Sequence, residues 1–142
     1  MFFGSFEHNL DEKGRLVIPR KMREEAGSKL FIMKGFDGAL SIFKESGFER
    51  LANEFASLPF NKKAARDYLR IQLATTVELD VDKAGRVQLP SQLLAKYQIS
   101  KEVIVIGCGD HIEVWDKKAF EKYEEDANAS FEATAELLDS KE

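Results

Sequence analysis

The chain has 142 residues and a formal net charge of -4, and 44% of its residues are hydrophobic and 32% charged. These proportions are typical of a soluble globular protein and exclude an intrinsically disordered chain. The single cysteine, Cys108, excludes an internal disulfide, and no apolar run approaches the roughly 20 residues that a membrane helix needs. The first residues contain no basic region followed by a long apolar run, so we expect no export signal. We therefore expect a cytoplasmic protein with one ordinary domain or two very small ones.

The negative charge is concentrated near the C-terminal end. Nine acidic residues and four lysines lie between Asp116 and Glu142, which leaves 17 basic and 16 acidic residues in the first 115. That larger part therefore has a net charge of +1. The overall acidity consequently does not exclude a nucleic-acid partner, which is bound through local clusters of lysine and arginine.

The first elements in the chain are predicted to be a β-hairpin and a short helix. Alternating apolar residues indicate strands at 5–10 and 15–18, and the polar turn between them contains Gly14. Pro19 suits the first position of a helix, where a missing N–H costs nothing. The other elements predicted for this part are a helix at 20–27 and strands at 30–33 and 39–43, the latter two joined by the turn GFDG.

Two helices are predicted in the middle of the chain. Residues 45–58 have apolar residues at helical spacing, and Pro59 ends the pattern. A second helix at 62–76, with Asn61 as its N-cap, is amphipathic. Its basic face, formed by Lys62, Arg66 and Arg70, is either solvated or in contact with the acidic tail of a neighbouring subunit.

The second half of the chain repeats the first. The stretch DEKGRLVIP at 11–19 returns 71 residues later as DKAGRVQLP at 82–90, and the alternation of apolar residues around it is repeated as well. The second copy therefore predicts strands at 76–81, 86–89, 103–106 and 111–115 and a helix at 91–98. An acidic helix at 117–138 follows, with an apolar stripe of Phe120, Tyr123, Ala127, Phe131 and Leu138.

Two arginines in the repeated stretch are candidates for binding. The Asp, Gly and Pro of the motif are explained by turn and helix geometry, but a hairpin does not require Arg15 and Arg86 at the same position twice. A guanidinium group pairs bidentately with guanine or grips a phosphate, and a β-ribbon enters the major groove. The cations near these turns are either phosphate contacts or solubilising groups: Lys13, Lys83, Arg20, Lys21 and Arg23, of which the last three add charge to the first copy only.

The two stretches resemble the paired D-x-x-G-R-x-x-x-P signatures of the MraZ family, bacterial transcriptional regulators of the division and cell-wall gene cluster. The likeness extends from MFFGSFEHNLDEKGRLVIP through YLRIQLATTVELDVDKAGRVQLP to HIEVWDKKAFEKY. It implies an α+β, mainly β fold in which two tandem swapped-hairpin (SpoVT-AbrB-like) repeats interlock as an intramolecular pseudo-dimer barrel with flanking helices. The corresponding segments are repeat 1 at 5–47, a helical connector at 48–75, repeat 2 at 76–119 and an acidic C-terminal helix and tail at 120–142.

The resemblance also implies a function. It predicts a repressor that binds double-stranded DNA at short repeated boxes upstream of its own operon, as a ring-like homo-oligomer associated with the nucleoid. The family's DNA-contacting arginines fall on Arg15 and Arg86. One departure is that Gln88 and Ser91 leave the second copy with fewer cations than the first, so the two DNA-binding heads are not expected to be equivalent.

No other constellation in the sequence predicts a site. Cys108 and His111 have ligand-like spacing, but a zinc site uses about four ligands and the other histidine, His8, is remote. The turns GFDG and GCGD lack the lysine and helix of a phosphate loop, and no nucleophile is accompanied by a base. We therefore expect no enzyme, cofactor, metal, membrane or small-molecule substrate. The alternative function is an antitoxin-like or scaffold protein whose C-terminal helix binds a protein partner.

Overall fold

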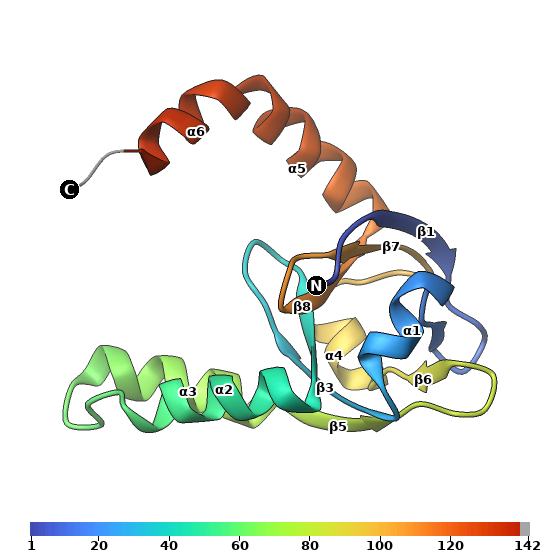
Figure 1. Ribbon diagram of the computed structural model, residues 1–142, viewed down its shortest axis with the longest axis horizontal. Helices are drawn as coiled ribbons and strands as arrows, with labels where there is room; N and C mark the ends of the chain where they lie inside the picture. Colours follow the sequence, from blue (N-terminus) through green and yellow to red (C-terminus); the bar gives the residue numbers. More distant parts are fainter. Residues whose placement is uncertain (140–142) are drawn as a thin grey trace.

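The computed structural model describes residues 1–139, which contain six helices and eight strands (Figure 1). None of these helices is long and apolar enough to span a lipid bilayer. In chain order the elements are β1 (Ser5–Asn9), β2 (Arg15–Val17), α1 (Arg20–Ala26), β3 (Lys29–Lys34), β4 (Leu40–Lys44), α2 (Glu45–Ala56), α3 (Lys63–Thr75), β5 (Val77–Asp80), β6 (Arg86–Gln88), α4 (Ser91–Lys96), β7 (Glu102–Gly107), β8 (His111–Asp116), α5 (Lys117–Ala129) and α6 (Phe131–Leu138).

The strands form one antiparallel sheet of six strands and a separate ribbon of two. The order in the sheet is β1-β7-β8-β4-β3-β5, and the ribbon pairs β2 with β6. Only β3 with β4 and β7 with β8 pair inside one half of the chain. Each of the other pairings joins a strand of the first half to one of the second. The mainly β, α+β class predicted from the sequence is confirmed for the described residues.

The strand pairing predicted for the two hairpins of the repeated motif is wrong, since β1 does not pair with β2 and β5 does not pair with β6. Both chain reversals form, because the N–H of Gly14 donates to the carbonyl of Asp11 and the N–H of Gly85 to that of Asp82, each at 2.9 Å. Beyond the turns, however, β1 pairs with β7 and β2 pairs with β6. Turn residues specify the reversal alone, whereas strand partners are chosen by which apolar faces are buried together.

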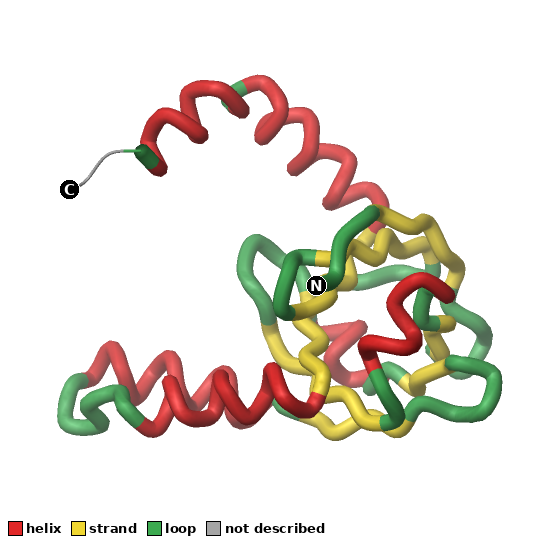
Figure 2. Tube along the Cα trace, viewed as in Figure 1, coloured by secondary structure: helices red, strands yellow, loops and turns green. Residues whose placement is uncertain are grey.

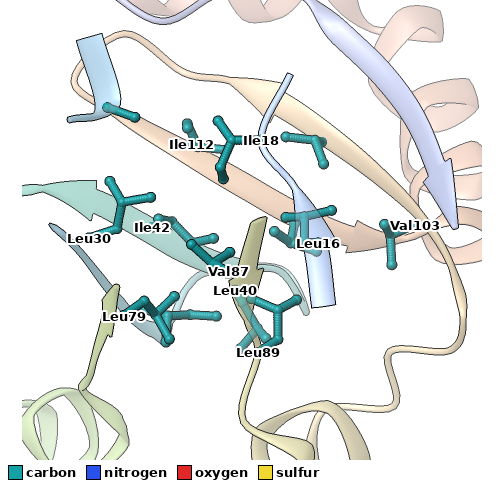
Figure 3. Packing of buried hydrophobic residues seen from close by; sticks show 14 of the residues in the cluster. Leu16, Ile18, Leu30, Leu40, Ile42, Leu79, Val87, Leu89, Val103 and Ile112 are labelled. Atoms are coloured by element: carbon teal, nitrogen blue, oxygen red, sulfur yellow. The ribbon is translucent and has the colours of Figure 1, made fainter. Parts of the chain in front are cut away.

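The hydrophobic core lies where side chains from the ribbon meet those of the sheet (Figure 3). Leu16 and Val87 lie opposite each other in the ribbon, and they are 0% and 1% exposed. The neighbouring positions Arg15 and Arg86 are only partly buried. This alternation buries one face of the ribbon and leaves the arginine face toward solvent.

Helices α2 and α3 form an arm that projects from the strands (Figures 1 and 2). Its base is attached by Phe48, whose ring stacks on that of Phe31 with centroids 4.1 Å apart. The predicted N-cap of α3, Asn61, is wrong. Asn61 lies inside a turn in which the N–H of Lys62 donates to the carbonyl of Pro59, and the first helical bond runs from the N–H of Arg66 to the carbonyl of Lys62. Lys62 is therefore the N-cap residue, and its side chain makes no capping hydrogen bond.

A second arm consists of α5 and α6 (Figure 1). Asp116 caps α5 by accepting from the N–H of Ala119 at 3.4 Å, and Phe120 packs against Trp115. The predicted single helix at 117–138 is divided at Ser130, where φ is -111° and ψ is 15°. The Ser130 hydroxyl donates to the carbonyl of Asp126, a local bond that competes with continuous helix. Residues 140–142 of the predicted acidic tail lie outside the described residues.

Replacing Leu16 with alanine should destabilise the protein by about 2–5 kcal/mol, the usual cost of truncating a fully buried leucine. Chemical denaturation measures the free energy of unfolding. Phe3→Ala is the control, because this large apolar side chain is 75% exposed, and its loss should change stability by no more than about 0.5 kcal/mol. Equal losses in the two variants would contradict the assignment of the core.

Candidate nucleic-acid interface

The turns before β2 and β6 hold their arginines with the same set of bonds. In the first turn, one carboxylate oxygen of Asp11 accepts from the backbone N–H groups of Lys13 and Arg15 at 2.9 and 2.8 Å. The other oxygen accepts from Arg15 Nε at 2.6 Å. The aspartate therefore closes the turn and orients the arginine at the same time.

The second turn repeats this geometry. Asp82 accepts from the backbone N–H groups of Ala84 and Arg86, both at 2.9 Å, and from Arg86 Nε at 2.9 Å. Gly14 and Gly85 have φ of 75° and 78°, a conformation that costs glycine little and other residues more. The Asp and Gly of the repeated motif are thus explained by the turn.

The ion pair leaves part of each arginine available. Only Nε of Arg15 and of Arg86 is bonded to aspartate, and neither arginine's terminal Nη groups have a partner among residues 1–139. The side chains are 30% and 36% exposed. With Nε bonded to aspartate, each anchored arginine keeps the four N–H donors of its two Nη groups free of partners among these residues.

The ribbon brings the two arginines together on one face. In its register Arg15 lies opposite Gln88 and Val17 lies opposite Arg86. The two arginines are therefore diagonal neighbours, a relation that places Cα atoms about 7–8 Å apart. Each end of the ribbon is joined to the turn of the opposite half of the chain. The N–H of Ile18 donates to the carbonyl of Gly85, and the N–H of Leu89 donates to the carbonyl of Gly14.

The cations near the turns are distributed differently from the prediction. Arg23 was expected to add charge to the first copy only, which is wrong. Its Nε donates to the carbonyl of Ile18 at 2.9 Å, and a Cβ added at Gly85 would lie 2.5 Å from the same atom. Arg23 therefore lies against the second turn. At the first turn the corresponding neighbour is an apolar residue, Leu94, whose Cδ1 would be 3.5 Å from a Cβ at Gly14.

The remaining predicted residues lie around the ribbon. Lys13 and Lys83 are exposed in the first and second turns, and Arg20 is exposed at the start of α1. The amide of Gln88 donates to the carbonyl of Lys13, so the second repeat braces the first turn. The structure brings together the two arginines, whereas Lys13 and Lys83 lie in turns at opposite ends of the ribbon. The contact of Arg23 with the second turn has no signal in the sequence, because it exists only once the repeats exchange strands.

The electrostatics of the turns keep the ion pairs closed at neutral pH. The pKa of Asp11 is lowered chiefly by the hydrogen bond from the Arg15 backbone N–H; burial, the next-largest effect, raises it, and the Arg15 side chain and the Lys13 N–H lower it further. The pKa of Asp82 is lowered in the same way by Arg86 and Ala84. A lowered carboxyl pKa means that the pair is lost only as the pH falls through that value.

Comparison with known proteins identifies relatives along the whole chain. The profile of a family described as "MraZ protein, putative antitoxin-like" matches residues 1–71 and 73–141. A protein named transcriptional regulator MraZ from Caldanaerobacter subterraneus subsp. tengcongensis is 41% identical over 140 residues, covering 99% of this chain and 98% of the relative. Proteins with the same name from Thermoanaerobacter sp. and Mycoplasmoides gallisepticum are 40% and 39% identical over 139 residues, covering 98% of this chain and 97% and 98% of the relatives. The name of all three relatives describes a regulatory, non-enzymatic role.

An NMR titration of the carboxyl groups should give pKa values below 3.8, the ordinary value, for both Asp11 and Asp82. In Arg15→Ala the pKa of Asp11 should rise part of the way toward 3.8, because the backbone N–H groups remain while the side-chain donor is lost. The pKa of Asp82 in that variant is the internal control and should not move. Titration of Asp11 at or above 3.8 in the unaltered protein would show that the turn does not hold the arginine as described.

Proposed function

The chain belongs to the MraZ family, and from this premise we propose that it is a transcriptional regulator that binds double-stranded DNA through Arg15 and Arg86. The observation that carries the proposal is the pair of anchored arginines on one face of the ribbon. The name that the relatives of this chain share, transcriptional regulator, supports the regulatory role.

The chemistry of the two arginines fits base recognition in the major groove. A guanidinium group pairs bidentately with O6 and N7 of guanine, and a two-stranded β-ribbon is narrow enough to enter this groove. Aspartate fixes each side chain before DNA arrives, so less rotamer entropy is lost on binding. Lys13, Lys83 and Arg20 act as phosphate contacts that set the position of the ribbon, and Arg23 adds a cation at the second turn.

The finer fold proposal is a swapped-hairpin, SpoVT-AbrB-like pseudo-dimer barrel made by repeats at 5–47 and 76–119. Residues 48–75 connect the repeats, and 120–142 form the C-terminal segment. The exchange of strands supports it, since β1 pairs with β7, β5 with β3 and β2 with β6. In this arrangement the two turns are corresponding but unequal ends of one DNA-binding head, because Arg23 lies only beside the second.

We extend the proposal to the target. The protein would act in the cytoplasm, associated with the nucleoid, as a repressor of the division and cell-wall gene cluster at short repeated boxes upstream of its own operon. Repeated boxes suit a protein that offers many weak heads, because linked heads bind at a high effective concentration. The acidic C-terminal segment limits non-specific binding, which is mainly electrostatic.

Arg15→Ala and Arg86→Ala should each abolish binding to the DNA upstream of the protein's own gene, since each loses a bidentate contact worth about 1–3 kcal/mol in every head. Arg15→Lys should retain non-specific binding but lose discrimination between sequences, because lysine lacks the planar fork. Footprinting and fluorescence anisotropy over a salt titration measure both effects. Arg50→Ala, an exposed arginine on α2, is the control and should bind normally. Full-strength binding by both alanine variants would refute the proposed interface.

We also propose that the protein forms a ring-like homo-oligomer through its two arms. Helices α2 and α3 enclose a groove of about 520 Å³ with an almost wholly apolar lining that includes Phe55, Phe60, Leu69 and Leu73. On the other arm every described residue after Phe120 is exposed, and Phe131 and Leu138 are 68% and 82% exposed. Such apolar surface is costly to leave in water.

Charge and geometry favour one copy's C-terminal arm in the α2–α3 groove of the next copy. Arg66 and Arg70 lie on α3, whereas Glu132 and Glu136 lie on α6. The groove and the C-terminal arm are different surfaces of the same chain, so their contact is head-to-tail. A head-to-tail contact closes into a ring when its rotation permits.

Leu73→Glu and Phe131→Glu should each reduce the assembly to smaller species, because each buries an unpaired charge in the proposed contact. Mass photometry at a fixed protein concentration measures the change. Phe3→Glu places the same charge on an exposed phenylalanine outside both arms and should leave the mass unchanged. If both arm variants retain the mass of the unaltered protein, the proposed contact is wrong.

The second candidate function is an antitoxin-like or scaffold role, which the family description and the exposed apolar residues of the C-terminal arm favour. Here the arm binds another protein instead of a second copy. Removing residues 117–142 separates the two. Loss of a stoichiometric protein partner would support the second candidate, and loss of self-assembly alone would support the ring.

A further inference from the structure

The turn between β7 and β8 places three potential metal ligands on the outer side of the sheet. Cys108 lies in the turn, and His111 and Glu113 are alternate residues of β8. Ile112 and Val114 are fully buried in the core, so strand alternation directs His111 and Glu113 to the opposite face. The sulfur of Cys108, a ring nitrogen of His111 and a carboxylate oxygen of Glu113 all lie within 4.8 Å of one another.

Backbone bonds hold this turn in place. The N–H of Cys108 donates to the carbonyl of His111 at 2.8 Å, and Gly109 has φ of 86°. Phe2 bridges to the same turn, because its N–H donates to the carbonyl of Gly109 and the N–H of Gly109 donates to the carbonyl of Phe2, both at 2.8 Å. The ligands therefore stand on a fixed scaffold, which a metal site requires.

Neighbouring groups orient two of the three ligands. Nδ1 of His111 lies 2.7 Å from a carboxylate oxygen of Asp110, while Nε2 lies 3.7 Å from an oxygen of Glu113. Trp115 Nε1 donates to the other oxygen of Glu113 at 2.9 Å. A carboxylate on one histidine nitrogen with the other nitrogen directed at the metal is the usual outer-shell arrangement of zinc proteins. The Phe43 ring, with its centroid 4.9 Å from that of His111, fixes the imidazole plane.

We propose that Cys108, His111 and Glu113 bind a divalent transition-metal ion of the zinc type, with its fourth position open to water or another ligand. Sulfur, imidazole nitrogen and carboxylate oxygen are the three ligand classes that zinc accepts. Three protein ligands and an open position form one of its two common coordination patterns. This site lies outside the proposed DNA-binding ribbon, and the inference does not depend on the proposed function.

The distances are compatible with this ion. Metal bonds of about 2.0–2.3 Å in a tetrahedral site place ligand atoms roughly 3.5 Å apart. The His111–Glu113 separation of 3.7 Å already satisfies this. The remaining separations, at most 4.8 Å, close by side-chain rotation at Cys108, which is exposed and reachable from solvent.

Metal binding would link the turn to the N-terminal segment. The S–H bond of Cys108 breaks as the sulfur–metal bond forms, and the proton passes to the solvent. Because Phe2 is bonded to Gly109 in the same turn, a bound ion stabilises the attachment of the N-terminal segment as well as the turn. The sequence indicated only two ligands, Cys108 and His111, and for this reason predicted no metal. In the folded protein, strand alternation adds Glu113 as a third ligand.

The experiment uses the full-length protein after removal of metals with a chelator. Co²⁺ is titrated as the spectroscopic probe, because a cobalt–thiolate bond produces a charge-transfer absorption, and Zn²⁺ is then added to displace it. The expected results are one Co²⁺ per chain, a thiolate band that Zn²⁺ abolishes, and a Tm that rises with Zn²⁺. Cys108→Ser should lack the band, and Glu113→Gln should bind at least tenfold more weakly.

Two further variants make the test decisive. His111→Gln should weaken binding at least tenfold, whereas His8→Gln alters the other histidine of the chain and should bind normally. Circular dichroism establishes that each variant is folded. The proposal is overturned if the unaltered protein gives no thiolate band, or if Cys108→Ser binds Zn²⁺ as tightly as the unaltered protein.

Discussion

The structure depends on the exchange of strands between the two repeats. Leu16 of β2 and Val87 of β6 are buried against each other in a ribbon that neither half of the chain makes alone. Each turn also receives a backbone hydrogen bond from the opposite half, through Ile18 to Gly85 and Leu89 to Gly14. A hairpin of this length is marginal in water. Two copies together bury one core, and the repeated motif is the local sequence that both copies need for that exchange.

The exchange has a direct consequence for the arginines. Because β2 and β6 run antiparallel, identical positions in the two repeats become diagonal neighbours on one face. Asp11 and Asp82 then anchor Nε and leave the outer donors of Arg15 and Arg86 available. The two ends are related but unequal, since Arg23 accompanies the second turn. The second copy of the motif has fewer cations than the first, and Arg23 from the first repeat partly makes up this difference at the second turn.

The other features are separated in space from this ribbon. The arms of α2–α3 and α5–α6 leave the strands and carry most of the exposed apolar side chains, including Phe60, Leu73 and Phe131 (Figure 1). The cluster around His111 lies on the outer side of β8. The proposed DNA-binding ribbon, the two apolar arms and the polar cluster therefore lie on different surfaces around one shared core. Separate variants therefore report on each surface independently.

The sequence by itself determined the local features of this protein. Periodicity, prolines and the repeated motif predicted most strands and helices and the two turns, since these depend on residues close together in the chain. Two local details were wrong, the N-cap of α3 and the unbroken helix at 117–138. The larger failures lie where long-range contacts decide: β1 pairs with β7 instead of β2, and Arg23 lies against the opposite repeat. Only the tertiary structure settled these arrangements. The physical reason is that turn and helix geometry is encoded locally, whereas a strand's partner is the one that buries its apolar face, wherever in the chain that partner lies.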